Sequence, residues 1–244
     1  MANRRESWVA DCELIAMDPA EFPTALAELS ALYGPQSHPA GADPLHQLLW
    51  ESAGYLCTDE RRLSAFNALR DRVGFEPEAI LATSPDLLWE IAALGGIHPD
   101  IRAGRMREIA EIALDEFHGD LYSACKLPLK QAMKSFQRFG GIAEPGAAKV
   151  LLFARAFPLL PFDSNGLRTS MRLLGAADSG NYCKDYKTVQ SVLAPVIGED
   201  FEALEQAYLL LRTHGKTICK TNGPLCDECP LSDRCEWYTR LHEV

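Results

Sequence analysis

Apolar residues recur along this chain every three to four positions, in segments separated by Gly, Pro, Asp or Ser. This period matches the 3.6 residues of a helical turn, whereas the alternating Val, Ile and Thr runs typical of strands are scarce. The sequence therefore predicts an all-α fold. The clearest periods run over Asp43–Asp59, Arg61–Val73, Pro85–Ala93, Ala103–Phe117, Leu127–Phe139, Ala147–Phe157, Ser164–Leu174 and Phe201–Thr213.

Two of these segments carry helix-start signals. Ser84 precedes Pro85, and Asp43 precedes Pro44. Serine and aspartate cap free amides at a helix start, and proline fits the first turn because it lacks an N–H group. We therefore expect helices to begin at these two prolines.

Composition and charge give opposing indications about a nucleic-acid partner. The 244 residues are 47% hydrophobic, enough for one large core or two small ones, which excludes a disordered chain. The net charge of −10 argues against DNA, because Lys and Arg supply most nonspecific affinity for phosphates. However, residues 121–172 contain eight Lys and Arg against two acidic residues, a balance of +6 that leaves −16 elsewhere. This stretch is typical of a one-sided DNA surface, although solvated helix faces also produce such clusters.

Nothing in the sequence indicates export or membrane insertion. The apolar runs are too short to span a bilayer, and the first residues are not followed by the apolar segment of a signal peptide. We expect a cytoplasmic protein, nucleoid-associated in a prokaryote, with no membrane partner, and a monomer. Four scattered cysteines are expected to be reduced and to act as small buried hydrophobic residues: Cys12, Cys57, Cys125 and Cys183.

Four further cysteines lie within seventeen residues near the end of the chain. Cys219, Cys226, Cys229 and Cys235 follow the spacing C-x6-C-x2-C-x5-C. So dense a group suits an iron–sulfur cluster better than two disulfides in a chain without secretion signals. Zinc is the first alternative, but zinc sites usually pair two CxxC units across a longer loop, and only one such unit is present.

The cysteine spacing resembles the [4Fe-4S] cluster loop of the endonuclease III superfamily of DNA glycosylases. A second segment, Phe139–Phe157, contains Gly-Gly between two helical periods and resembles the helix-hairpin-helix motif. In that motif the turn directs backbone N–H groups toward a DNA phosphate, and the second helix adds its positive N-terminal dipole. The resemblance implies DNA contacts at Gly140, Gly141, Ile142, Ala143, Gly146 and Lys149.

The segment Asp163-Ser-Asn165-Gly-Leu-Arg168 resembles the family's loop with its catalytic aspartate, at the right distance after the hairpin. Residues 43–59 resemble the first helix of the family, and Glu51 falls where adenine and some thymine mismatch glycosylases carry a glutamate. The resemblance implies Asp163 and Glu51 as catalytic residues, with Tyr55 and Asn165 in the substrate pocket. It covers about residues 37 to 240.

These roles correspond to a division of labour between paired carboxylates. A glutamic acid with a raised pKa would protonate the departing base, while ionised Asp163 would stabilise the sugar cation. For Glu51 the alternative is an exposed glutamate beside Tyr55, on the flank of the apolar stripe of its helix.

The resemblance also implies an organisation in two helical domains. One, over residues 37–157, would be a helical barrel with the hairpin, and residues 1–36 and 158–244 together would form the iron–sulfur cluster domain. The implied activity is a DNA glycosylase of base excision repair, with double-stranded DNA containing a damaged or mismatched base as its partner.

Departures from the family pattern refine this expectation. Pro145 stands where bifunctional members carry a lysine nucleophile, which predicts a monofunctional glycosylase without lyase activity. Lys149 lies one turn further, and we expect it to be a surface lysine that faces phosphate, with a position near the pocket as the alternative. Ala143 and Glu144 also weaken the hairpin as a phosphate site. Pro145, Glu144 and the net negative charge favour a non-catalytic DNA-lesion binder of the same fold as the alternative function, and a zinc-stabilised helical module is a third.

The positions that fill the gap left by a flipped base are apolar in this chain. Leu56 and Ile97 occupy them, where they would either wedge the base stack open or pack in the core. The excised base is not readable from the sequence. Because the chain ends nine residues after Cys235, without the additional domain of the adenine-specific branch, adenine opposite oxidised guanine is disfavoured.

Overall fold

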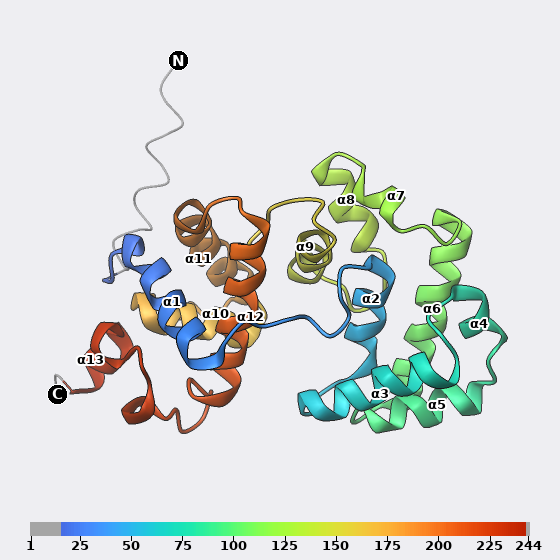
Figure 1. Cartoon of the computed structure of the whole chain (residues 1–244), viewed down its shortest axis with the longest axis horizontal. Coiled ribbons are helices and arrows are strands. Elements are labelled where there is room, and N and C mark those ends of the chain that lie inside the picture. Colours follow the sequence, from blue (N-terminus) through green and yellow to red (C-terminus); the bar gives the residue numbers. More distant parts are fainter. Residues whose placement is uncertain (1–15, 243–244) are drawn as a thin grey trace, which may run out of the picture. The chain divides into compact units, whose positions relative to one another are not determined.

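The computed structural model describes residues 16–242, and within this range the regular elements are all helical, which confirms the predicted all-α class (Figure 1). One isolated bridge pairs Tyr55 with Gly96. The elements are α1 (Phe22–Tyr33), α2 (Pro44–Ala53), α3 (Asp59–Arg72), α4 (Pro77–Ala82), α5 (Pro85–Leu94), α6 (Pro99–Phe117), α7 (Tyr122–Cys125), α8 (Leu129–Phe136), α9 (Glu144–Phe153), α10 (Ser164–Leu174), α11 (Tyr182–Ile197), α12 (Phe201–Thr217) and α13 (Glu236–His242), with 3-10 turns at Pro19–Glu21, Cys226–Glu228 and Ser232–Arg234.

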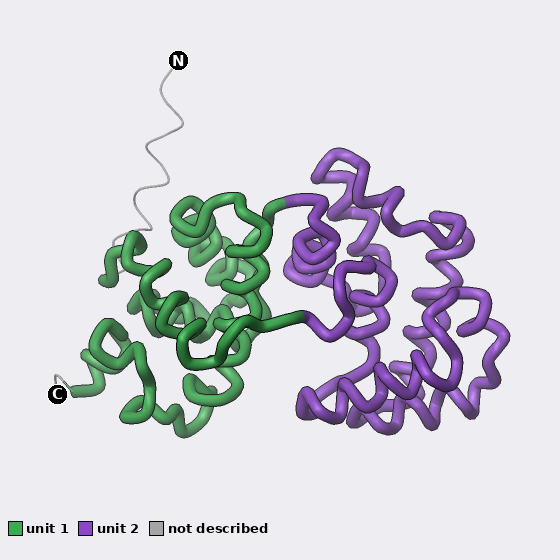
Figure 2. The backbone as a smooth tube through the Cα atoms, viewed as in Figure 1, with its two compact units in different colours: residues 1–37, 158–244 green, residues 38–157 purple. Residues whose placement is uncertain are grey.

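The chain divides into two compact units (Figure 2). Unit 2 is the continuous segment His38–Phe157 and contains α2 to α9. Unit 1 combines the segments on either side of it, up to Ser37 and from Pro158, and contains α1 and α10 to α13. Among the described helices, none is long and apolar enough to cross a membrane.

In unit 2 the helix α2 lies at the centre of the core. Leu48, Leu49 and Ala53 of α2 are completely buried, and the helix packs on α3, α6 and α9. Asp43 begins the helix as expected, since its carboxylate accepts hydrogen bonds from the amides of Leu45 and His46. The capping of α5 by Ser84, which accepts from the amide of Leu87, is confirmed as well.

In unit 1 the helices α10 and α12 pack closely against each other, and α1 packs on α12. The core consists of buried apolar side chains from all three helices, among them Phe22, Leu29, Leu174 and Leu210. This packing fixes the start of α10, where the predicted catalytic aspartate lies.

One predicted helix is shorter in the structure. The segment expected to be helical over Asp43–Asp59 stops at Ala53, and the chain is extended at Gly54. A Cβ at Gly54 would approach the Cys57 sulfur and the Arg62 side chain to 2.8 Å, so the sharp exit after α2 requires glycine. The expectation that Tyr55 lies beside Glu51 on the same helix is therefore wrong, because Tyr55 belongs to the following loop.

The scattered cysteines do not share one environment. Cys125 is buried as expected, and its thiol pKa is raised by burial to about 11. Cys57 is half-buried and Cys183 is exposed, so the prediction of a buried residue is wrong for Cys183. Cys12 lies outside the described residues.

Candidate functional site

The hairpin consists of α8, a turn over residues 137–143, and α9. Gly141 adopts a left-handed backbone with φ of 83°, which glycine tolerates without strain. Gly140 lies against the Glu108 side chain, where an added Cβ would come within 2.5 Å of a carboxylate oxygen. The turn is thus closely fitted to α6, which the sequence reasoning did not foresee.

The predicted DNA contacts of the hairpin differ in accessibility. Gly141 and Ala143 are exposed, and Gly140 and Gly146 are half-buried. Ile142 is buried, and its amide donates to the carbonyl oxygen of Phe139, so this N–H group is already used within the turn. Ala143 is the N-cap of α9 and provides no side-chain cap among the described residues, which leaves the first turn to other acceptors.

Lys149 is not the surface residue that the sequence predicts. Its side chain is only 4% exposed, and its ammonium group donates a hydrogen bond to Oε1 of Glu51 on α2. The cause is the position of α9, which is buried on all its sides over residues Ala147 to Phe153. Lys149 therefore contributes less to a phosphate-facing surface than its charge suggests.

Glu51 is a partly buried carboxylate held by two cations. Arg62 from α3 lies 3.6 Å from the same oxygen that Lys149 contacts. Burial favours the neutral carboxyl, but the charges of Lys149 and Arg62 outweigh it and lower the pKa of Glu51 to about 2. The expectation of a raised pKa is wrong, since no cation near Glu51 was foreseen.

The two predicted wedge residues are exposed rather than packed in the core. Leu56 is 76% exposed and adopts a left-handed backbone with φ of 46°, while Ile97 is 46% exposed. A non-glycine residue in this conformation is strained and persists only where its surroundings impose it. Tyr55, the predicted pocket residue, is also half-exposed beside Leu56.

A buried arginine connects the two loops that carry Leu56, between α2 and α3, and Ile97, between α5 and α6, which we call the wedge loops. Arg102 of α6 donates to the carbonyl oxygens of Ala53, Gly96 and Ile97 at 2.8 to 3.0 Å. The amide of Tyr55 donates to Gly95 at 3.1 Å. The sequence reasoning missed Arg102, and the only local signal is an arginine in the first turn of a helix that follows Gly-Gly.

In unit 1, Asp163 is the N-cap of α10. Its Oδ1 accepts a hydrogen bond from the backbone N–H of Gly166 at 2.7 Å. Its Oδ2 lies 3.3 Å from the side-chain Nδ2 of Asn165 and 3.3 Å from Nε of Arg212. The side chain remains 27% exposed. The structure thus fixes the carboxylate from three sides and leaves part of it accessible.

Asn165, the second predicted pocket residue, connects this carboxylate to the helix behind it. Its side-chain oxygen accepts from Arg168, whose guanidinium also donates to the carbonyl of Gly215 on α12 at 2.7 Å. A Cβ at Gly215 would lie 2.6 Å from the backbone oxygen of Asn165, so α10 rests directly on the α12 backbone. The position of Asp163 therefore depends on tight backbone packing.

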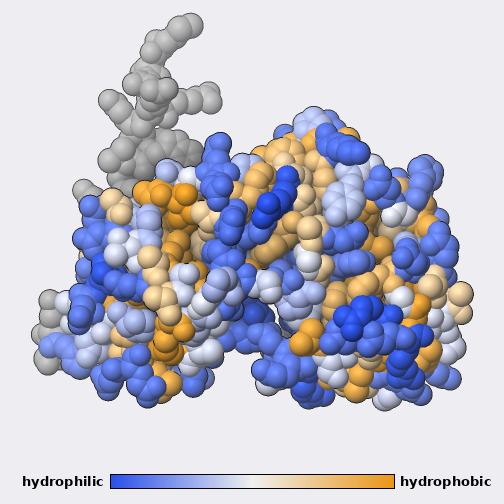
Figure 3. All heavy atoms as spheres, viewed as in Figure 1, coloured by the Kyte–Doolittle hydropathy of each residue, from blue (hydrophilic) through white to orange (hydrophobic). Residues whose placement is uncertain are grey.

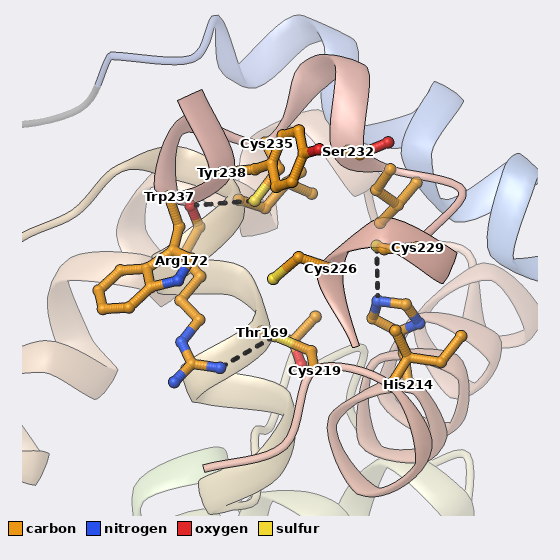
Figure 4. A pocket seen from close by; sticks show the side chains of 13 residues that line it. Thr169, Arg172, His214, Cys219, Cys226, Cys229, Ser232, Cys235, Trp237 and Tyr238 are labelled. Carbon is orange, nitrogen blue, oxygen red and sulfur yellow. Dashed lines mark hydrogen bonds between the residues drawn. The ribbon is translucent and has the colours of Figure 1, made fainter. Parts of the chain in front are cut away.

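The four C-terminal cysteines line one pocket in unit 1 (Figure 4). Cys229 lies 3.4 Å from Nε2 of His214, and Arg172 donates to the Cys219 sulfur at 3.5 Å. Burial raises the pKa of the Cys229 thiol to about 11 and lowers that of His214 to about 4. The loop is held to α10 by Arg172, which also donates to the carbonyl of Lys220 at 2.8 Å.

The donor set of this pocket suits a thiolate-bound metal centre, since four cysteine side chains face a common space. The described His, Cys, Asp and Glu residues nevertheless do not include a group of three or more that converges closely enough to hold a metal ion. The residue types and their common pocket fit a thiolate-bound cluster.

The basic stretch over residues 121–172 presents less positive surface than its composition implies. Lys126, Lys130 and Lys134 are exposed, but Lys149 is buried, and Arg168 and Arg172 donate to backbone carbonyls of the cluster loop. On the face shown in Figure 3, apolar patches lie among hydrophilic residues.

Comparisons with known proteins show relatives across most of the chain. It is 25% identical to an endonuclease III of Sulfolobus acidocaldarius, covering 74% of this chain and 76% of that protein. It is 24% identical to an endonuclease III of Thermotoga maritima, covering 84% and 88%, and 25% identical to a thymine-DNA glycosylase of Aeropyrum pernix, covering 66% and 69%. No family model matches the chain.

Solved structures show the same fold at lower identity. An endonuclease III in a non-covalent DNA complex superposes with a TM-score of 0.74 at 17% identity, covering 94% of this chain and all of that one. A thermostable thymine-DNA glycosylase superposes with a TM-score of 0.73 at 17% identity, covering 91% and 97%. The relatives by sequence are thus DNA glycosylases, and the fold is theirs.

Proposed function

We propose that this chain, which belongs to the endonuclease III superfamily of helix-hairpin-helix proteins, is a monofunctional DNA glycosylase of base excision repair. Its substrate is double-stranded DNA with a damaged or mismatched base, which is flipped out and removed by hydrolysis of the N-glycosidic bond. Support comes above all from Asp163, an accessible carboxylate held in place by Gly166, Asn165 and Arg212.

Asp163 is suited to stabilise positive charge on the sugar. As the glycosidic bond breaks, the sugar acquires oxocarbenium character, and a fixed carboxylate stabilises that charge without reorganising. Glu51 serves in this proposal as a carboxylate and not as a proton donor, since Lys149 and Arg62 keep it ionised.

The exposed wedge residues support the extrusion of a base. Leu56 and Ile97 lie on loops that Arg102 holds together, so their apolar side chains are available to enter a base stack. The hairpin amides, in particular those of Gly141, Ala143 and Gly146, would contact the DNA backbone.

The absence of lyase activity is part of the proposal. Pro145 lies in the first turn of α9 and has no nucleophilic group. Cys219, Cys226, Cys229 and Cys235 would hold a [4Fe-4S] cluster, whose role is to fix the C-terminal loop to α10 and α12. The cluster takes no part in the bond cleavage that we propose.

The test is a panel of duplexes, each with one lesion or mismatch, scored with and without hot alkali. We expect strand breaks only after alkali and no covalent adduct after borohydride treatment, because no Schiff base forms. Asp163→Asn should lower single-turnover excision by roughly 10²-fold or more, while DNA binding largely survives.

The alternative outcomes are distinct. If Asp163 only caps α10, the variant should lose about 1 kcal/mol of stability with nearly unchanged turnover, so melting temperatures are measured on the same preparations. A wild-type chain that excises nothing but binds distorted DNA tightly, with steep salt dependence, would favour a non-catalytic lesion binder. Trapping that vanishes in Lys149→Ala would show that the chain uses a lysine nucleophile.

A further inference from the structure

Glu51, Lys149 and Arg62 form a cluster of charges from three helices of unit 2. Lys149 on α9 and Arg62 on α3 both contact Oε1 of Glu51 on α2. Arg62 is held in addition by the Trp50 ring, whose centroid lies 5.6 Å from the guanidinium carbon. The arrangement therefore has a defined geometry and is not a loose surface pair.

A lysine that is 4% exposed is costly for the fold. Burying an ammonium group carries a large desolvation penalty, which an ion pair often fails to offset, so an apolar residue would usually stabilise the fold as much. The neighbours of Lys149 along α9 are apolar and buried, as expected for a core helix. Packing alone gives no reason for a lysine at this position.

The two carboxylate oxygens of Glu51 differ in their contacts. Both cations contact Oε1, so among the described residues Oε2 is left open on a side chain that is 31% exposed. The charged and titratable groups facing this carboxylate are Lys149, Arg62 and, from the segment before α2, His38, and each lowers the pKa of Glu51. One oxygen is anchored and the other is free to accept a hydrogen bond.

We infer that Lys149 is a positioning residue that holds Glu51 as an ionised hydrogen-bond acceptor, which suits a base that leaves without taking a proton from this residue. The inference rests on the proposed glycosylase function. It assigns Lys149 to the chemistry of the site instead of to phosphate binding or to nucleophilic attack.

The consequence for the substrate follows from leaving-group chemistry. Uracil and thymine depart as resonance-stabilised anions, and an alkylated purine already carries positive charge, so neither needs a proton from a neighbouring acid. A neutral adenine leaves readily only when it is protonated, which an ionised Glu51 does not provide. We therefore expect excision of uracil, thymine or alkylated purines to exceed that of mispaired adenine by at least about tenfold.

The first test measures Glu51 without any substrate. Carbon-13 labelling of glutamate, with Glu51→Gln to assign the resonance, gives the titration midpoint of Glu51 in the whole chain. Lys149→Met should raise that midpoint by about one pH unit or more, because a stabilising positive charge is removed. Lys184→Met, at an exposed site on α11, removes the same charge elsewhere and should leave the midpoint unchanged.

A second variant covers the case in which Lys149→Met does not fold. Arg62 is 20% exposed, so Arg62→Met removes a cation from the same oxygen with less disturbance of the core, and it should raise the midpoint by a smaller amount. An unchanged Glu51 titration in the folded variants would overturn the positioning role.

The second test uses excision. In single turnover, the acid limb of the rate profile should move to higher pH in Lys149→Met, in step with the Glu51 titration, and Lys149→Arg should restore part of it. A rate that falls equally at every pH would show a merely structural role. Preferred excision of mispaired adenine would overturn the substrate assignment, and a wild type without any excision would count against the proposed function while the Glu51 titration still decides the role of Lys149.

Discussion

The wedge loops of unit 2 and the C-terminal loop of unit 1 are both irregular segments held by arginines. They differ in how many of their polar and sulfur-containing groups have a bonding partner within the chain. In the wedge loops, Arg102 is bonded to three carbonyls and the backbone bridge of Tyr55 and Gly96 closes the arrangement. In the C-terminal loop, Arg172 bonds the backbone, yet four cysteine side chains face a pocket without joining one another. The first arrangement is complete with the atoms of the chain, whereas the second would be completed by the proposed cluster.

The largest effect should follow from breaking the four-cysteine set. Cys226→Ala should reduce bound iron by roughly tenfold or more and lower the thermal stability of unit 1, because a ligand is lost and not merely a contact. Iron per chain and the visible absorbance measure this directly. Cys183→Ala, at an exposed cysteine of the same unit, is the control and should retain its iron. Purified wild type with one zinc and no iron would contradict the assignment.

The stability of the wedge loops should instead fall when the buried guanidinium of Arg102 is removed. Arg102→Met leaves three carbonyls without their donor, so we expect about 3 kcal/mol of destabilisation in urea unfolding. Arg107→Met, which removes a single bond to the Thr83 carbonyl, should cost about 1 kcal/mol or less. Equal losses of unfolding free energy in the two variants would mean that Arg102 does not hold the wedge loops together.

The smallest effect concerns the residue that these loops present. Leu56→Ala should change stability by less than about 0.5 kcal/mol, because the side chain is 76% exposed. Affinity for lesion-containing duplex should nevertheless fall by roughly fivefold, the equivalent of about 1 kcal/mol of apolar contact. Leu63→Ala on α3, a second exposed leucine, should leave DNA binding unchanged. Fluorescence anisotropy at fixed salt makes the comparison.

The same contrast explains what the sequence predicts well. Helical periodicity and local capping depend on neighbouring residues, so the all-α class, the span of α10 and the caps at Asp43 and Ser84 were accessible from the pattern. The end of α2 at Ala53 was not, because Gly54 is required by contacts with Cys57 and Arg62 in the next turn of chain.

The chemistry of the site was less predictable than its location. Asp163 caps a helix through a contact with a near neighbour in the sequence, whereas the lowered pKa of Glu51 is caused mainly by Lys149, 98 positions away. A single sequence carries no signal for such a pair, so the raised pKa and the exposed lysine were both incorrect. The iron–sulfur cluster and the individual site roles stay predictions.

The contact of Asn165 with Gly215 restricts how this protein can vary. A Cβ at position 215 would lie 2.6 Å from the Asn165 backbone oxygen, so even the smallest side chain would displace the turn that carries Asp163. Substitutions at this buried position would be expected to remove activity in a saturation library, while most exposed positions of α12 accept change. The position of α12 that tolerates mutation least is therefore Gly215. The reason is the close approach of its backbone to Asn165, and not a reactive side chain.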